Sequence, residues 1–215
     1  MIGGSGKLGG ALAARFARAG RHVIIGSRDE ERARDAARAV GARAGEGGGL
    51  VEGSSNAAAA ASGDIAVLTV PFESQEQILP GLAEACRGKV VVSTAVPVRF
   101  ADGGPEHVVV PQGSAAQQVA ELLPGARVVG ALHSVSSSTL ARLDRSIDAD
   151  ILVTGDDAAA KASTAALLAG LEGARCVDGG PLRNSAYVEQ LTVVLLTINL
   201  RVHRSTGIRV TNLPE

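Results

Sequence analysis

The sequence is poor in aromatic residues: of its 215 residues none is Trp, one is Tyr and three are Phe. It therefore lacks the side chains on which a single-stranded nucleic acid stacks its bases. An excess of positive charge is absent too, because 21 Lys and Arg face 22 Asp and Glu and give a formal net charge of -1. A nucleic-acid-binding domain shows a clearly basic balance, so nucleic acid is not an expected partner.

Cysteine and long apolar runs are also scarce. Cys86 and Cys176 are the only cysteines and form no CxxC motif, which argues against a disulfide framework and against a cysteine-based metal site. The apolar run from Leu191 to Leu200 is interrupted by polar residues and is too short for a bilayer core of about 30 Å. The N-terminus carries glycines in place of the charged segment and apolar core of a secretory peptide. We expect a cytoplasmic protein with no membrane partner and no metal.

Short runs of β-branched residues alternate with alanine-rich stretches along the first part of the chain. Runs that are apolar at every position are typical of parallel strands, because helices cover both faces of a parallel sheet. Leu8, Leu12 and Phe16 recur every four residues, which predicts a packed helix that ends at Gly20. The predicted strands cover residues 22–26, 64–70, 89–93, 127–131 and 151–153.

The positions of glycine and alanine predict the structure of residues 29–61. A helix over about 29–40 stops at Gly41, the glycine-rich residues 42–53 form a loop, and the alanines of 57–61 form a short helix. The order strand, helix, strand, helix predicts an α/β fold with a Rossmann-type, doubly wound parallel sheet.

The pattern changes after residue 151. We predict a helix over 158–171, a short strand over 175–177, and a long helix over 184–203 that is apolar on more than one side and therefore buried. These elements form a small, mainly helical C-terminal lobe over 151–215, packed on a nucleotide-binding Rossmann domain over 1–150. The crevice between the two units is the candidate active site.

The strongest chemical signal is a glycine motif at the N-terminus. Residues 4 to 9 read Gly-Ser-Gly-Lys-Leu-Gly, which fits G-x-G-x-x-G at the start of a helix. Gly4 permits the tight turn, Gly6 lets a pyrophosphate approach the backbone, and Gly9 lets the helix pack closely on a strand. The helix N-terminus then offers amide donors and a partial positive charge to the phosphates. The motif predicts a dinucleotide site.

The end of the second predicted strand indicates which dinucleotide. A dinucleotide fold places there, about twenty residues after the glycine motif, the side chain that meets the adenosine ribose. Ser27 and Arg28 occupy this position in place of an acidic residue, and Arg32 follows one helical turn later. Hydroxyl donors and guanidinium charge suit a 2'-phosphate, which favours NADP over NAD. Arg34 and Arg38 are interpreted as a solvated face balanced by neighbouring acidic residues.

The glycine motif follows an unusually short segment. Only Met1, Ile2 and Gly3 precede it, where the fold needs a strand of about five residues, so the first strand is largely missing. That strand lies at the centre of such a sheet, and its loss leaves backbone groups unpaired. Two interpretations stay open: a start upstream of Met1, or a sheet completed in another way.

Further motifs run through almost the whole chain. They are Asp64-Ile-Ala-Val-Leu-Thr-Val-Pro-Phe72, Gly113-Ser-Ala-Ala-Gln-Gln-Val-Ala-Glu-Leu-Leu123, Ala131-Leu-His133, Gly155-Asp-Asp157, Gly179-Gly-Pro-Leu-Arg-Asn-Ser185, Val188-Glu-Gln-Leu-Thr192 and Ile208-Arg-Val-Thr211. With the glycine motif and Ser27-Arg28, they make the chain resemble the NADPH-dependent reductases of the deazaflavin coenzyme F420, also called F420-dependent NADP oxidoreductases. The motifs from Gly113 onward are the more specific ones.

The resemblance implies direct hydride transfer between C4 of the nicotinamide of NADP(H) and C5 of coenzyme F420, with both rings stacked in the crevice. It also implies residue roles. Ser5, Gly6, Lys7 and Leu8 match the pyrophosphate loop, and Ser27, Arg28 and Arg32 match the 2'-phosphate clamp. Phe72 and Val98 match positions beside the cofactors, while His133 and Thr192 match catalytic positions that face the deazaflavin.

The residues alone leave alternatives open. Phe72 also fits a core aromatic residue, His133 a satisfied polar residue, and Thr192 a hydroxyl that bonds back to the preceding turn. Ala186 and Gln190 stand where some relatives have Arg and Ser, a departure that concerns the deazaflavin rather than NADP. The alternative functions are an NADP-dependent reductase of another small imine or carbonyl compound, with a histidine as proton donor, and a non-catalytic NADP(H) sensor. The apolar C-terminal helix favours a homodimer.

Overall fold

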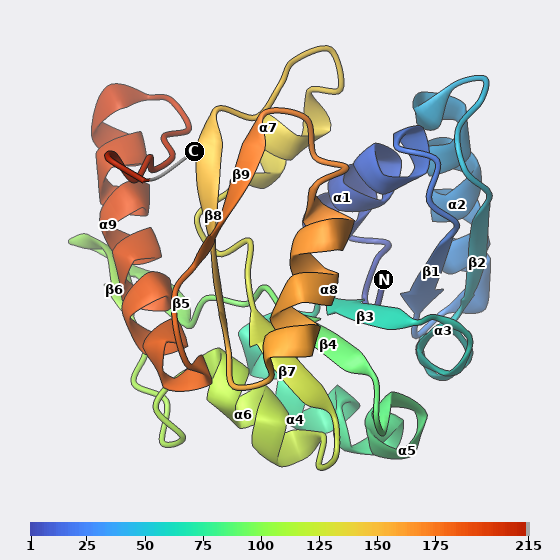
Figure 1. The fold of residues 1–215 in the computed structure, drawn as a ribbon, viewed down its shortest axis with the longest axis horizontal. Helices are drawn as coiled ribbons and strands as arrows, with labels where there is room; N and C mark the ends of the chain where they lie inside the picture. Colours follow the sequence, from blue (N-terminus) through green and yellow to red (C-terminus); the bar gives the residue numbers. More distant parts are fainter. Residues whose placement is uncertain (214–215) are drawn as a thin grey trace.

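The computed structural model describes residues 1–213 and has an α/β architecture (Figure 1). Its strands are β1 (Val23–Ser27), β2 (Val51–Ser55), β3 (Ile65–Leu68), β4 (Val90–Ser93), β5 (Val98–Ala101), β6 (Gly104–His107), β7 (Arg127–Gly130), β8 (Ala149–Gly155) and β9 (Ala174–Asp178). Its helices are α1 (Lys7–Arg18), α2 (Glu30–Ala44), α3 (Asn56–Ser62), α4 (Gln75–Ile78), α5 (Ala83–Cys86), α6 (Ala115–Leu122), α7 (Ser137–Ala141), α8 (Ala158–Leu168) and α9 (Ser185–Val202).

The strands form a mostly parallel sheet with helices on both faces, which confirms the predicted fold class. Five strands follow the order β3-β4-β7-β8-β9, and β1 pairs with β2 beside them. Two hydrophobic cores lie on opposite faces of the sheet, and neighbouring residues of β4 belong to different ones. Val92 packs with α1 and α8, while Val91 packs with α3 and α6. Burial on both faces explains why these strands are apolar at every position.

The N-terminal residues take the place of the missing first strand. Ile2 forms two backbone hydrogen bonds with the β3 segment, from its N–H to the Val67 oxygen and from the Thr69 N–H to its own oxygen, both at 2.9 Å. On the other side, the Gly26 N–H donates to the Met1 oxygen at 2.8 Å. Met1 and Ile2 therefore join β1 to β3 across the centre of the sheet.

The region predicted as a loop over 42–53 is partly regular, so that prediction was wrong. The helix α2 continues through Gly41 to Ala44, and β2 pairs with β1 in parallel. A Cβ on Gly53 of β2 would lie 2.3 Å from the Ala33 carbonyl carbon of α2, so glycine is required where helix and strand touch. The antiparallel hairpin β5–β6 and the helix α6 were not predicted from periodicity.

The strand β8 extends the sheet across the predicted boundary at residue 150. It pairs antiparallel with β7 and parallel with β9, so residues on both sides of that boundary share one sheet. The division into units 1–150 and 151–215 stays a prediction. No helix within residues 1–213 has the length and apolarity that a membrane crossing requires.

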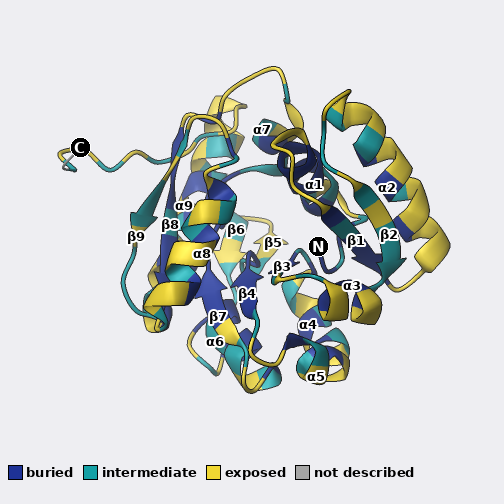
Figure 2. Cartoon of the chain, turned by 45° about the vertical axis from the view of Figure 1, so that its right-hand side comes forward, coloured by how far each residue is buried: buried dark blue, intermediate teal, exposed yellow. Residues whose placement is uncertain are grey.

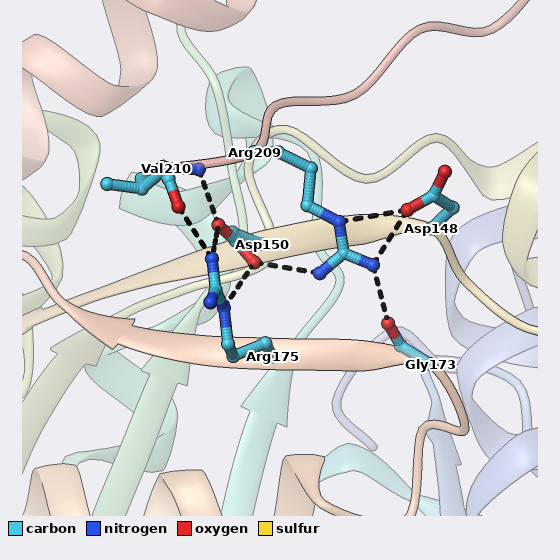
Figure 3. Close-up of polar contacts among 6 residues, drawn as sticks. All are labelled: Asp148, Asp150, Gly173, Arg175, Arg209 and Val210. Atoms are coloured by element: carbon cyan, nitrogen blue, oxygen red, sulfur yellow. Dashed lines mark hydrogen bonds and ion pairs between the residues drawn. The ribbon is translucent and has the colours of Figure 1, made fainter. Parts of the chain in front are cut away.

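A buried carboxylate ties the C-terminal segment to β8 (Figure 3). The side chain of Asp150 is fully buried and accepts hydrogen bonds from Arg175 at 2.8 and 3.0 Å and from Arg209 at 3.0 Å. The Val210 N–H donates to the same carboxylate at 2.6 Å. These bonds hold the pKa of Asp150 well below its usual range, with the Arg175 hydrogen bond as the largest cause.

The burial pattern separates the centre of the molecule from its outer helices (Figure 2). The strands β4 and β7 are almost entirely buried, while the outer side of α2 is exposed. The helix α9 buries only part of its surface and exposes a stripe of large apolar side chains, namely Tyr187, Val194, Ile198 and Val202. The prediction that this helix is buried on more than one side was therefore only partly right.

Candidate active site

The glycine motif forms the predicted tight turn into α1. A Cβ on Gly9 would lie 2.5 Å from the Gly4 Cα, and a Cβ on Gly4 would lie 2.7 Å from the Met1 Cβ, so both positions require glycine. Gly3 has φ 71°, and a Cβ there would lie 2.9 Å from Val70. A Cβ on Gly6, by contrast, would approach no protein atom closer than the Gly3 oxygen at 3.7 Å. The space above Gly6 is open to a ligand, as the motif predicts.

The N-terminus of α1 lacks a side-chain cap. Its N-cap is Gly6, and no acidic residue lies in its first turn. The helices α2 and α8 differ, because Asp29 and Asp157 accept hydrogen bonds from their first N–H groups. The first-turn N–H groups of α1 therefore remain available for an anion, which is the arrangement that binds a pyrophosphate.

The predicted clamp residues lie beside this turn. Ser5, Ser27, Arg28 and Arg32 line one cavity of about 420 Å³ together with the glycine loop. Within residues 1–213 neither Arg28 nor Arg32 forms an ion pair with a protein carboxylate. Two exposed cations on one cavity suit a ligand phosphate, so the residues present fit NADP.

The other arginines of α2 behave as the sequence indicated. Arg34 pairs with Glu30 at 2.9 Å, and Arg38 pairs with Asp35. All four side chains are largely exposed, so these pairs form the solvated face of the helix. Arg28, which precedes α2, and Arg32 on its first turn thus differ from Arg34 and Arg38 in having no carboxylate partner among the described residues.

A second cavity contains the residues that were predicted to face the reacting rings. Phe72, Val98, His133 and Thr192 line about 370 Å³, although they come from four separate parts of the chain. The two cavities share the wall formed by Leu8, Thr69, Val70 and Pro71. The two cavities therefore adjoin each other along this wall, with the clamp residues lining one and His133 lining the other.

The backbone before His133 is strained. Leu132 has φ 68°, a left-handed conformation that costs a non-glycine residue about 1 kcal/mol or more. It follows directly after β7, where the Ala131 N–H still pairs with the Ser93 oxygen at 3.0 Å. The turn at Leu132 places His133 against the cleft, and such strain is common at functional sites.

His133 is a neutral group in this position. Its side chain is fully buried, and burial lowers its pKa to about 4. Neither ring nitrogen has a hydrogen-bond partner among the described residues. The residue lines the second cavity, but its ring lies behind the surface of the wall. Thr192 lines the same cleft, but its hydroxyl donates to the Val188 oxygen at 3.0 Å, which is the back-bond that the sequence left open.

Sequence reasoning missed Glu189. Its side chain is fully buried and lies 4.0 Å from His133, measured from Oε1 to Nε2. Its carboxyl group accepts from the N–H groups of Ala115 at 2.9 Å and Ala116 at 3.2 Å, at the start of α6. Burial raises its pKa to about 7 against these two bonds. A single acidic residue within an apolar helix was the signal that would have pointed to it.

The two departures from the family pattern lie outside the cleft lining. Gln190 is exposed and Ala186 is partly buried, and neither lines the second cavity. Arg183 borders a separate cavity with Asp156 and Glu121. Within residues 1–213 no cluster of three potential metal ligands occurs.

Comparisons with known proteins agree with this arrangement. The family model described as "NADP oxidoreductase coenzyme F420-dependent" matches residues 1–97. The F420-dependent NADP reductase of Methanothermobacter thermautotrophicus is 40% identical over 220 residues, covering 100% of this chain and 95% of the relative. The F420-dependent NADP reductase of Methanothermobacter marburgensis is 38% identical and covers 100% of this chain and 98% of the relative.

A solved structure gives the same result for the fold. A chain from Arthrobacter sp. FB24, which carries an inferred assignment as F420-dependent NADP reductase, superposes with a TM-score of 0.81 at 26% identity. The match covers 96% of both chains. The full-length identity to the two archaeal reductases shows that this chain belongs to the F420-dependent NADP reductase family.

Proposed function

We propose that the protein is an oxidoreductase that transfers a hydride reversibly between NADP(H) and coenzyme F420. The observation that carries the proposal is the pair of adjoining cavities, one lined by two arginines without a carboxylate partner among the described residues and the other lined by His133. Relatives with full-length similarity are named for the same two coenzymes. The two coenzymes supply the redox chemistry: the hydride moves between nicotinamide C4 and deazaflavin C5.

The protein's first task is to bind NADP(H) in one orientation. The first-turn N–H groups of α1 and the open space above Gly6 suit the pyrophosphate. Ser27, Arg28 and Arg32 hold the 2'-phosphate, which NAD lacks. Leu8 and Val70, on the wall shared by both cavities, then direct the nicotinamide end toward the second cavity.

The second task is to align two rings and exclude water. Phe72, Val98 and Leu196 give the second cavity an apolar lining. Holding two reactants at transfer distance replaces the entropy that a bimolecular reaction in solution loses. Because burial keeps the pKa of His133 at about 4, its ring adds no charge to the wall of the second cavity at neutral pH.

We further propose that the exposed stripe of α9 is covered by a second copy of the chain. Tyr187, Val194, Ile198 and Val202 lie at spacings of seven, four and four residues, so they share one side of the helix. An apolar stripe with a single flanking charge, Arg201, pairs with its own copy about a two-fold axis, which gives a homodimer. The same helix carries Glu189 and Thr192, so a dimer would also support the cleft wall. Val194→Glu is expected to give a monomer in light scattering.

The two cysteines support a reducing location. Cys86 is buried and Cys176 is partly buried, and neither forms a disulfide. Burial raises the pKa of both thiols, which lowers their reactivity. We propose that the protein works in the cytoplasm, where thiols stay reduced.

Absorbance at the band of oxidised coenzyme F420 tests the function directly. The purified chain is mixed with coenzyme F420 and NADPH, with NADH as the control. Enzyme-dependent bleaching that prefers NADPH is expected. NADPH binding without bleaching would instead support a reductase of another imine or carbonyl substrate, or a sensor, and would overturn the proposal.

A further inference from the structure

The carboxyl group of Glu189 occupies a site that offers it no positive charge. It lies at the N-terminus of α6, where it accepts from Ala115 and Ala116, while Ser114 caps the next N–H at 3.0 Å. Burial is the main cause of the raised pKa of Glu189 and of the lowered pKa of His133. No charged side chain among the described residues contributes to either shift. The other ionisable residue on the cavity wall, Glu73, is exposed to solvent.

Glu189 and His133 are the nearest ionisable neighbours of one another. The gap of 4.0 Å between Oε1 and Nε2 exceeds the length of a hydrogen bond by about 1 Å, so the bond forms when the two side chains approach by that amount. Oε1 already accepts one N–H from Ala116, and a carboxyl oxygen has a second site for a proton or a donor. Both ring nitrogens of His133 lack a partner among the described residues, so this bond satisfies one of them.

The direction of that bond depends on the proton of Glu189. When the carboxyl group is protonated, it donates to Nε2, and the ring proton of neutral His133 lies on Nδ1. When the group is ionised, it accepts from Nε2–H, and Nδ1 carries a lone pair. Nδ1 is therefore a donor in one state and an acceptor in the other, while the imidazole stays neutral in both.

We propose that Glu189 is a positioning residue that sets the tautomer of His133 and thereby determines whether Nδ1 of this buried ring, behind the wall of the second cavity, is a hydrogen-bond donor or an acceptor. The inference deepens the proposed function and rests on it for its consequence in catalysis. The geometry also gives Glu189 a second task, because the same carboxyl group joins α9 to the start of α6. The two tasks are separable, since only the first depends on the proton.

The pH range of the switch follows from the burial of Glu189. Its raised pKa of about 7 places the change between pH 6 and 8 in the absence of a ligand. His133 does not take up the proton itself in this range, because burial lowers its pKa to about 4. Oxidation and reduction of the deazaflavin differ by one proton: NADPH, F420 and one proton give NADP⁺ and reduced F420. Because a catalyst accelerates both directions alike, the tautomer change does not move this equilibrium, and its effect is expected in the pH profile of kcat.

Nitrogen NMR of the histidine rings tests the proposal without turnover. The full chain is labelled with ¹⁵N-histidine, and the signal of His133 is assigned among the 4 histidines by its loss in His133→Asn. Wild type is expected to change from the Nδ1–H to the Nε2–H tautomer with a midpoint near pH 7. In Glu189→Gln the tautomer is expected to be the same at every pH. Glu121→Gln, an exposed carboxylate on α6, is the matched control and keeps the change.

The outcomes separate this inference from the proposed function. A single tautomer across the range in wild type, or an unaltered transition in Glu189→Gln, overturns the role of Glu189 whether or not coenzyme F420 is reduced. The wild-type titration alone decides the point if the variant does not fold. In turnover, Glu189→Gln is expected to lose the inflection near pH 7 in kcat with coenzyme F420 and to keep the wild-type affinity for NADPH. A variant that loses both the inflection in kcat and the affinity for NADPH would indicate a purely structural role of Glu189 and would contradict the proposal.

Discussion

Two buried carboxyl groups in the protein have opposite surroundings. Asp150 on β8 meets two guanidinium groups and a backbone N–H, and its pKa lies far below the usual range (Figure 3). Glu189 on α9 meets two backbone N–H groups and a neutral histidine, and its pKa rises to about 7. Both side chains are fully buried, so the difference comes from the neighbouring charge rather than from solvent exposure.

The difference separates a structural carboxylate from one that can change its charge. Asp150 stays ionised at neutral pH, and it holds the C-terminal segment against β8 and β9. Glu189 lies on the wall behind the cleft and changes its proton near neutral pH. A buried acid with a perturbed pKa beside a cleft is a typical functional group, whereas a fully paired one is typically structural.

The largest expected effect comes from removing the charge of Asp150. Asp150→Asn leaves Arg175 and Arg209 without their anion. The new side-chain amide also places an N–H donor where only donors surround it. We expect the free energy of unfolding at pH 7 to fall by about 2 to 4 kcal/mol. Urea denaturation measures it. Because the folded pKa of Asp150 is depressed, its stabilisation is present above pH 4 and is lost as the pH falls further.

The second effect is the pH dependence of stability that Glu189 causes. Its folded pKa of about 7 exceeds the unfolded value, so the folded state binds this proton more tightly. The stabilisation is present below about pH 4.5 and is lost as the pH rises through 7. The difference in unfolding free energy between wild type and Glu189→Gln should therefore fall by about 2 to 3 kcal/mol between pH 5 and 8. His133 is present in both proteins, so its own contribution to the pH dependence of stability largely cancels in this difference. A difference that rises with pH would contradict the assignment.

The third prediction concerns arginines with and without a protein partner. Arg28→Ala is expected to weaken NADPH binding by about 1.5 to 3 kcal/mol and to leave NADH binding nearly unchanged, since only NADPH has the 2'-phosphate. Isothermal titration of both nucleotides measures this. Arg34→Ala removes a nearby cation on α2 that pairs with Glu30, and it should change neither affinity. Equal losses for NADPH and NADH in Arg28→Ala would contradict the clamp.

The smallest effect is expected at Asp148, the second carboxylate of the cluster in Figure 3. It bonds to Arg209 at 2.7 Å, but 89% of its side chain is exposed. Asp148→Asn should change the unfolding free energy by less than about 0.5 kcal/mol in the same urea experiment, because exposed ion pairs contribute little. If Asp148→Asn lowered the unfolding free energy as much as Asp150→Asn does, burial would not explain the difference between the two carboxylates.

Local patterns predicted the parts of the fold that depend on local physics. The glycine motif gave the turn into α1, because the contact between Gly4 and Gly9 lies within one turn. The apolar runs gave β1, β3, β4, β7 and β8 to within a few residues. The strand β2 was missed because its sequence, Val-Glu-Gly-Ser-Ser, has little apolar character and gains its pairing from β1 and α2.

The site divides in the same way. Ser27 and Arg28 were found from their distance to the glycine motif, which the fold fixes. Phe72, Val98, His133 and Thr192 were found by resemblance, and the structure brings them to one cavity, although their roles stay predictions. Glu189 was missed because its significance arises from a distant contact: nothing in the sequence places the start of α6 beside α9.

The central claim is that one cleft brings both coenzymes together for direct hydride transfer. NADPH deuterated at nicotinamide C4, on each face in turn, is reacted with the protein and coenzyme F420 in ordinary water. We expect the deuterium of one of the two NADPH forms to appear at C5 of the reduced deazaflavin. Transfer of deuterium to the solvent from both deuterated forms of NADPH would contradict the account. So would recovery of both forms with their deuterium and without any reduction of coenzyme F420.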